Sequence, residues 1–129
     1  MSTRLLMTTS AVMMGAAGAA ASFLPQEILQ HAGLASNGSA VLGVQILGAL
    51  YLGFAMLNWI ARANLIGGIY SRPVAMGNFL HFTVAALALV KGAAAVPGLW
   101  EVWAAGGVSS TFALWFGLVV FRPASAAAI

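Results

Sequence analysis

Residues 40–61 read AVLGVQILGALYLGFAMLNWIA and contain no charged side chain. An α-helix needs about 20 mostly apolar residues to cross the hydrocarbon core of a bilayer, which is about 30 Å thick. The stretch is long enough, and it ends directly before Arg62. It therefore predicts a transmembrane helix.

Three further stretches have the same character, namely residues 5–23, 73–90 and 103–121, and every charged residue lies outside all four. Of the 129 residues, 62% are hydrophobic and only 5% are charged, whereas a soluble domain carries roughly a quarter charged residues. We therefore expect an all-α integral membrane protein. Residues 1–129 should form a single transmembrane domain, a four-transmembrane-helix bundle with spans at about 5–23, 40–61, 73–90 and 103–121.

The residues between these stretches predict turns and helix ends. Pro73 suits the first position of a helix, and Gly92 after Lys91 suits a C-cap. Pro97 and Gly98 mark a turn before the last span.

The longest connection, residues 24–39, should hold a short helix at Pro25 to Ala32. Its Ile28 and Leu29 are expected to face lipid, and its polar residues are expected to face water: Glu27, Gln30 and His31. The run Ser36-Asn37-Gly38-Ser39 should supply the N-cap of the second span.

The arginines predict the orientation. With four spans, one side of the membrane holds Arg4, Arg62, Arg72 and Arg122. The other side holds Lys91, Glu27 and Glu101. Because basic residues accumulate in cytoplasmic loops, we expect both termini to be cytoplasmic and a single orientation.

An alternative concerns the first span. Arg4, the apolar run after it and Ala19-Ala20-Ala21 resemble a secretory signal peptide, and cleavage near Ala21 would leave three spans. We expect the first span to be retained.

Two predicted spans carry small residues along one face. In the first span these are Ala11, Gly15, Gly18 and Ser22, and in the fourth they are Gly106, Ser110, Ala113 and Gly117. Small residues let membrane helices approach closely. We expect two tight packing faces, with spans one and four against each other or a homodimer as alternative arrangements, although alanine-rich helices also produce such stripes by chance.

Polar side chains inside the spans define the candidate site. At 1.5 Å per residue, Asn58 lies about 6 Å and Tyr51 about 16 Å from Arg62, and Asn78 lies about 9 Å and His81 about 13 Å from Arg72. Asn58 is therefore level with Asn78, and Tyr51 with His81. This predicts a polar seam between spans two and three, with Arg62 and Arg72 at its cytoplasmic mouth.

His81 has two interpretations. It could handle a proton or hold a cofactor, or it could be a neutral histidine that hydrogen-bonds to Tyr51 or Asn78 and holds two helices together. We favour the structural interpretation and expect no cofactor, since a bis-histidine haem needs a second histidine at the same depth, and His31 lies in the outer loop. Glu27, His31 and Glu101 could meet around a divalent ion, but we expect solvated loop residues and no metal.

The composition excludes several functions. The chain has no cysteine and no aspartate, so it has no thiolate chemistry and no Ser-His-Asp triad. No carboxylate lies inside a predicted span, although proton-coupled exporters of this size usually depend on one. The basic residues are scattered singly, which argues against nucleic acid as a partner. We expect no catalytic residues, and we lean towards a protein that is not an enzyme.

Residues 57–82, LNWIARANLIGGIYSRPVAMGNFLHF, have the densest pattern in the chain. They resemble a block in small uncharacterised bacterial four-helix membrane proteins, whose architecture is broadly similar to that of the DoxX-like family. The segment SFLPQEIL at residues 22–29 is similar to the same group. The resemblance implies a multi-pass protein of the bacterial inner membrane and brings no established activity.

Two hypotheses of function follow. The first is a non-enzymatic accessory, scaffold or interaction subunit in the lipid bilayer, which forms a homo-oligomer or joins a larger membrane complex. The alternative is binding or transport of a small solute or a lipophilic, quinone-like ligand through the polar seam of Tyr51, Asn58, Asn78 and His81. A filled seam with satisfied hydrogen bonds favours the first hypothesis, and a cavity that reaches His81 favours the second.

Overall fold

The computed structural model describes residues 3–63 and 72–121, and these residues form five α-helices and no strand. Four helices are long: α1 (Thr3–Phe23), α3 (Gly38–Ala61), α4 (Arg72–Ala95) and α5 (Trp100–Val120). Each is long and apolar enough to cross a membrane. The fold is therefore all-helical, with four candidate spans at the predicted places, as in a multi-pass membrane protein.

All four long helices begin before the predicted spans, and the largest differences are at the end of α4 and the start of α5. α4 continues through Lys91 and Gly92 to Ala95, so the prediction that Gly92 caps this helix is wrong. α5 begins at Trp100 and includes Glu101 in its first turn. A charged residue marks where hydrocarbon should end, but it does not break a helix, and alanine favours helical backbone. The helices therefore continue where the apolar runs stop.

The predicted short helix is present as α2 (Pro25–His31), with proline in its first turn. Ile28 is 39% exposed as expected, but Leu29 is only 5% exposed, so the expectation that Leu29 faces lipid is wrong. Leu29 lies one turn after Pro25, which is also buried, so both belong to the packed face of α2. The polar residues on its other faces are exposed: Glu27, Gln30 and His31.

The start of α3 is capped as the sequence predicts. The Oδ1 atom of Asn37 accepts a hydrogen bond of 2.9 Å from the backbone N–H of Ala40. The carbonyl oxygen of Asn37 accepts a second bond, of 3.0 Å, from the N–H of Val41. An N-cap side chain that binds the third helical N–H satisfies one of the four free donors at a helix start. Asn37 thus fixes where α3 begins.

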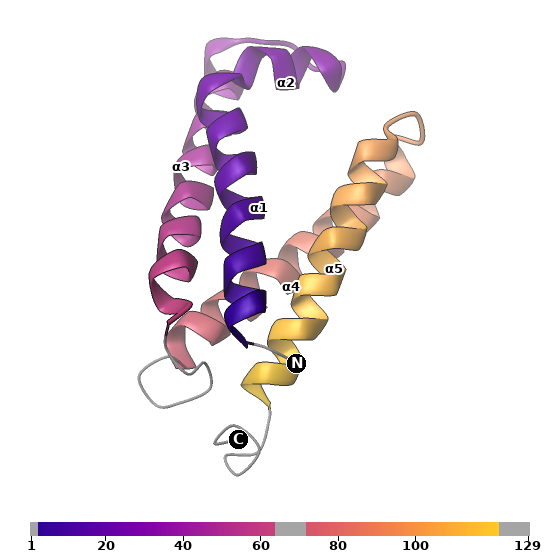
Figure 1. Ribbon diagram of the computed structural model, residues 1–129. Coiled ribbons are helices and arrows are strands. Elements are labelled where there is room, and N and C mark those ends of the chain that lie inside the picture. Colours follow the sequence, from indigo (N-terminus) through magenta and orange to yellow (C-terminus); the bar gives the residue numbers. More distant parts are fainter. Residues whose placement is uncertain (1–2, 64–71, 122–129) are drawn as a thin grey trace. The chain divides into compact units, whose positions relative to one another are not determined.

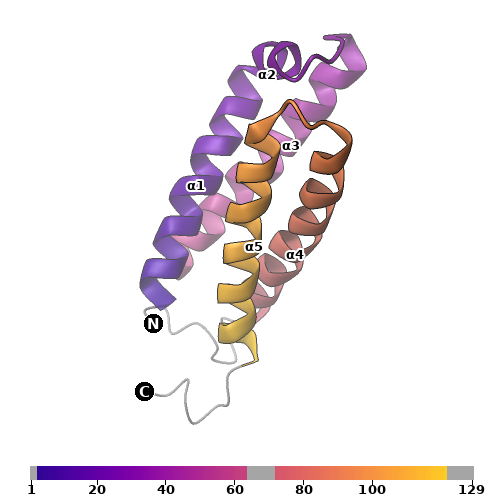
Figure 2. The same ribbon diagram turned by 90° about the vertical axis from the view of Figure 1, so that its right-hand side faces the viewer.

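The chain divides into two compact units. The first is Met7–Ile60, in which α1 and α3 lie side by side and antiparallel, with α2 across one end (Figure 1). The second contains α4 and α5, which form an antiparallel hairpin (Figure 2), together with the start of α1 up to Leu6. The turn between α4 and α5 contains Pro97 and Gly98, as predicted.

Some expectations lie outside the described residues. These include the position of Arg122 and the loop of residues 64–71 between α3 and α4. The expectation of a single transmembrane domain over residues 1–129 stays a prediction.

Candidate functional site

Asn58 connects α3 to α1 through its side chain. Its amide nitrogen Nδ2 donates a hydrogen bond of 3.0 Å to Oγ of Ser10 and lies 3.9 Å from Sδ of Met14. Oγ of Ser10 in turn donates a bond of 3.1 Å to the carbonyl oxygen of Met7. Asn58 and Ser10 are both fully buried. The three groups form a continuous hydrogen-bonded chain inside the unit Met7–Ile60.

This chain has a physical reason in an apolar environment. A polar side chain in hydrocarbon needs partners within the protein, because no water is present to bind it. The hydroxyl of a helical serine can donate a hydrogen bond to a backbone carbonyl of the preceding turn, and its oxygen can still accept another hydrogen bond. Ser10 therefore accepts from Asn58 without leaving a buried donor unbound.

Ser10 was not predicted as a partner of Asn58, although its position in the sequence indicates it. Ser10 follows Arg4 by six residues, which places it about 9 Å along α1, close to the depth of about 6 Å for Asn58. It was hidden by the alanine-rich surroundings of the first span, where a serine looks like another small residue. A comparison of depths across all spans would have added Ser10 to the possible partners of Asn58.

The backbones of α1 and α3 lie close together at two glycines. A Cβ atom on Gly18 would lie 2.9 Å from the backbone nitrogen of Leu52 and 3.0 Å from the carbonyl oxygen of Gly48. A Cβ on Gly48 would lie 2.8 Å from the backbone nitrogen of Ser22. The two backbones are thus close enough that no side chain fits between them. This confirms a tight packing face on the first span. Its partner at Gly18 is α3, so the two predicted arrangements, with the fourth span or a second copy against this face, are wrong here.

Aromatic rings fill the contact between α4 and α5. Phe82 is 1% exposed, and its ring stacks on those of Phe112 and Phe116 at centroid distances of 5.0 and 5.8 Å. Gly117 makes room for the ring of Phe79, whose Cε2 atom would lie 3.0 Å from a Cβ at that glycine. The predicted small-residue face on the fourth span is therefore a packing face too, and it packs on α4.

Asn78 and His81 lie on α4. Asn78 is fully buried, and its Nδ2 donates a hydrogen bond of 2.9 Å to the carbonyl oxygen of Val74, one turn earlier. His81 is half-buried, and its ring meets the edge of the Phe82 ring at a centroid distance of 5.0 Å. Both residues thus have contacts within their own helix.

The remaining predicted site residues lie elsewhere along α3 and α4. Tyr51 is half-buried in the middle of α3, Arg62 follows the last residue of α3, and Arg72 is the exposed first residue of α4. The pairings across the predicted seam, Asn58 with Asn78 and Tyr51 with His81, stay predictions.

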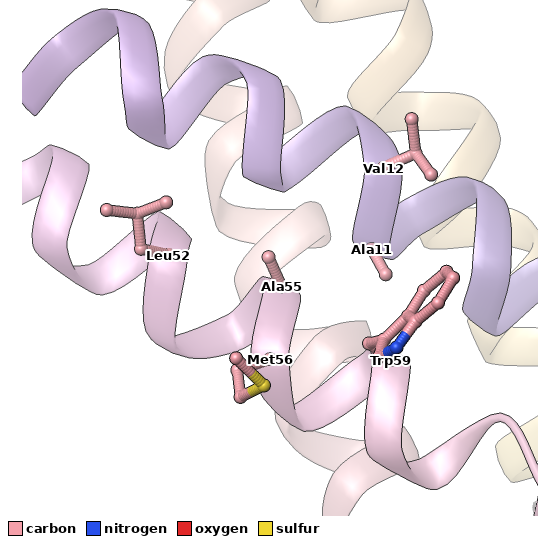
Figure 3. A pocket seen from close by; sticks show the side chains of 6 residues that line it. All are labelled: Ala11, Val12, Leu52, Ala55, Met56 and Trp59. Carbon is pink, nitrogen blue, oxygen red and sulfur yellow. The ribbon is translucent and has the colours of Figure 1, made fainter.

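Two cavities open within the two units. The first has a volume of about 240 Å³ and lies between α1 and α3 (Figure 3). The second, of about 340 Å³, lies between α4 and α5 and includes Phe79, Thr83 and Ser110 in its lining. Neither of these two cavities is lined by any of the six predicted site residues.

Within residues 3–63 and 72–121, no three His, Asp or Glu side chains gather in a group that could hold a metal ion. No model of a known protein family, no curated protein and no solved structure matches the chain. The resemblance to the DoxX-like group therefore stays a prediction from residues 22–29 and 57–82.

Proposed function

We propose that this chain is a non-enzymatic multi-pass membrane protein that acts as an accessory or scaffold subunit. The observation that carries the proposal is the hydrogen bond from Asn58 to Ser10. The asparagine that we singled out as a ligand group is fully buried and binds a neighbouring helix. A polar group used in this way holds helices together and is not presented to a solute.

Other polar side chains in the long helices support the proposal. Asn78, Ser110 and Thr111 each donate a hydrogen bond of 2.8 to 2.9 Å to a backbone carbonyl one turn earlier in the same helix. The outer surface of α3 is apolar and exposed, with Leu50 at 59% and Ile60 at 65%. Such a surface suits lipid, a second copy or another membrane protein.

The proposed setting is the inner membrane of a bacterium, with both termini in the cytoplasm. The resemblance at residues 57–82 supports the bacterial membrane. The four arginines at the predicted inner side support the orientation. The proposed partners are the lipid bilayer, with self-association or a larger membrane complex through the outer helix surfaces.

A double-mutant cycle at Ser10 and Asn58 tests this function. We expect Ser10→Ala to lower the free energy of unfolding in detergent, because Nδ2 of the buried Asn58 loses this acceptor. Asn58→Leu removes the amide itself, so adding Ser10→Ala to it should cost little more. The coupling between the two sites should be about 0.6 kcal/mol, and at most about 1.7 kcal/mol.

The control is Thr111→Ala. Thr111 is exposed, and its hydroxyl donates a hydrogen bond to a carbonyl oxygen of its own helix. This change should leave stability nearly unchanged. The carrier hypothesis predicts the opposite pattern at Asn58. Under it, Asn58→Leu would keep or raise the stability of the empty protein and would abolish co-purification of a small molecule, and that outcome would contradict the scaffold role.

A further inference from the structure

The cavity between α1 and α3 has an almost wholly apolar lining. Its volume is about 240 Å³, and it is lined by Ala11, Val12, Leu52, Ala55, Met56 and Trp59. Ala11 and Ala55 are the small residues of the lining, and the side chain of Trp59 lies next to the α1 backbone (Figure 3). The indole nitrogen of Trp59 is the one polar side-chain atom among the six residues.

The cavity is a groove on the outer face of this helix pair. Val12 is 61% exposed, Met56 is 60% exposed and Trp59 is 44% exposed. In a membrane, an apolar groove on the outer face of two spanning helices meets acyl chains, not water. A flexible apolar chain that enters from the side fits such a groove.

Basic residues lie towards the same end of both helices. Because α1 and α3 are antiparallel, the start of α1 and the end of α3 share one end. Arg4 lies two turns before Ala11 on nearly the same face of α1, and Arg62 follows Trp59 by three residues. Tryptophan is enriched at the membrane interface, so Trp59 suits the depth at which an acyl chain joins its head group.

We propose that this groove, defined by Ala11, Val12, Leu52, Ala55, Met56 and Trp59, binds an acyl chain of an anionic phospholipid in the leaflet on the side of Arg4 and Arg62. The groove accounts for the chain, and the positive charge at this end of the helices accounts for the head group. Basic residues at the membrane surface attract anionic lipids over zwitterionic ones.

Trp59 is itself the reporter for the test. The full chain carries Trp100→Phe, Trp103→Phe and Trp115→Phe, so that Trp59 is the only tryptophan left. It is placed in phosphatidylcholine vesicles that contain equal mole fractions of brominated phosphatidylglycerol or brominated phosphatidylcholine, whose bromines quench tryptophan on contact. We expect phosphatidylglycerol to occupy the site with an apparent affinity about fivefold higher.

Two variants separate the groove from the charge. Val12→Phe fills the groove and should remove the preference for phosphatidylglycerol, and Arg62→Gln should reduce it. The matched control is Leu47→Phe, on α3 and 49% exposed but outside the groove, which should leave the preference intact. If the triple variant folds poorly, the same quenching is measured on the wild-type protein and on Trp59→Phe, and the two are compared.

Three outcomes would overturn the proposal. Equal quenching by the two lipids would mean that ordinary boundary lipid touches Trp59. A preference that survives Val12→Phe would place the lipid outside the groove. Shielding of Trp59 from both lipids, relieved when the protein is diluted in the vesicles, would make a second copy of the chain the occupant.

Discussion

Replacing Gly48 with alanine is expected to lower the free energy of unfolding by about 1–3 kcal/mol, although the change adds a single methyl group. The new Cβ would lie 2.5 Å from Oγ of Ser22, 2.8 Å from its backbone nitrogen and 2.9 Å from the carbonyl oxygen of Gly18. Two of these atoms are backbone and cannot rotate away. The helices must separate, which also lengthens the Asn58–Ser10 hydrogen bond. Unfolding with a denaturing detergent measures the loss.

The same helix supplies the controls for Gly48→Ala. A Cβ on Gly43 or Gly53 would meet no atom within 4 Å. Gly43→Ala and Gly53→Ala should therefore keep stability or raise it by about 0.5–1 kcal/mol, because alanine favours helical backbone over glycine. Equal losses at all three positions would show that α1 and α3 do not pack through Gly48.

Phe82→Ala should have one of the largest effects of any truncation in the α4–α5 hairpin. The ring is 1% exposed and stacks on two other phenylalanines. Its removal leaves a cavity that the rigid rings of Phe112 and Phe116 cannot fill, and truncation of a buried phenylalanine costs about 3–5 kcal/mol. We expect a correspondingly lower midpoint in the same detergent titration.

Leu80→Ala is the matched control, two residues earlier on α4. Leu80 is 61% exposed, so its side chain faces lipid in the proposed setting, and its loss should change stability little. A Phe82→Ala variant as stable as Leu80→Ala would contradict the aromatic core between these helices.

The positions of the long helices could be predicted because each depends on a local property. An uncharged apolar run of about 20 residues has few structural alternatives. The same holds for α2, which begins at Pro25, and for the N-cap at Asn37. The end of α4 at Ala95 and the start of α5 at Trp100 were missed. The predicted third span ended before Lys91 and the predicted fourth span began after Glu101, because hydrocarbon should end at these charged residues, but helical backbone continues past them.

The partners of the helix faces could not be read from the sequence in the same way. Gly18 and Gly117 were identified as close-packing positions, and the structure confirms both. Their contacts depend on how helices assemble in three dimensions, and small-residue stripes on two spans are compatible with several pairings. Gly48 was missed because the positions one turn before and after it carry large residues: Val44, Gln45, Tyr51 and Leu52.

The hydrogen-bond partners in the candidate site could likewise not be predicted from the sequence. Depth along the helices correctly picked Asn58 and Asn78 as buried polar residues that need partners. Depth alone cannot choose among several spans at the same level, so the bond to Ser10 was not foreseen. The hydroxyl groups of Ser110 and Thr111 donate hydrogen bonds to backbone carbonyls of their own helix. A polar residue in a span therefore does not by itself indicate a ligand-binding site.

The proposed function requires four helices that cross a membrane, with both termini in the cytoplasm. The chain has no cysteine, so single cysteines can be introduced by Ser36→Cys, Gly98→Cys, Asn64→Cys and Ser125→Cys. In intact cells, a membrane-impermeant thiol reagent should label the variants at positions 36 and 98. It should label those at 64 and 125 only after the membrane is opened. Labelling of positions 64 and 125 in intact cells, or of 36 and 98 on opposite sides, would contradict this topology.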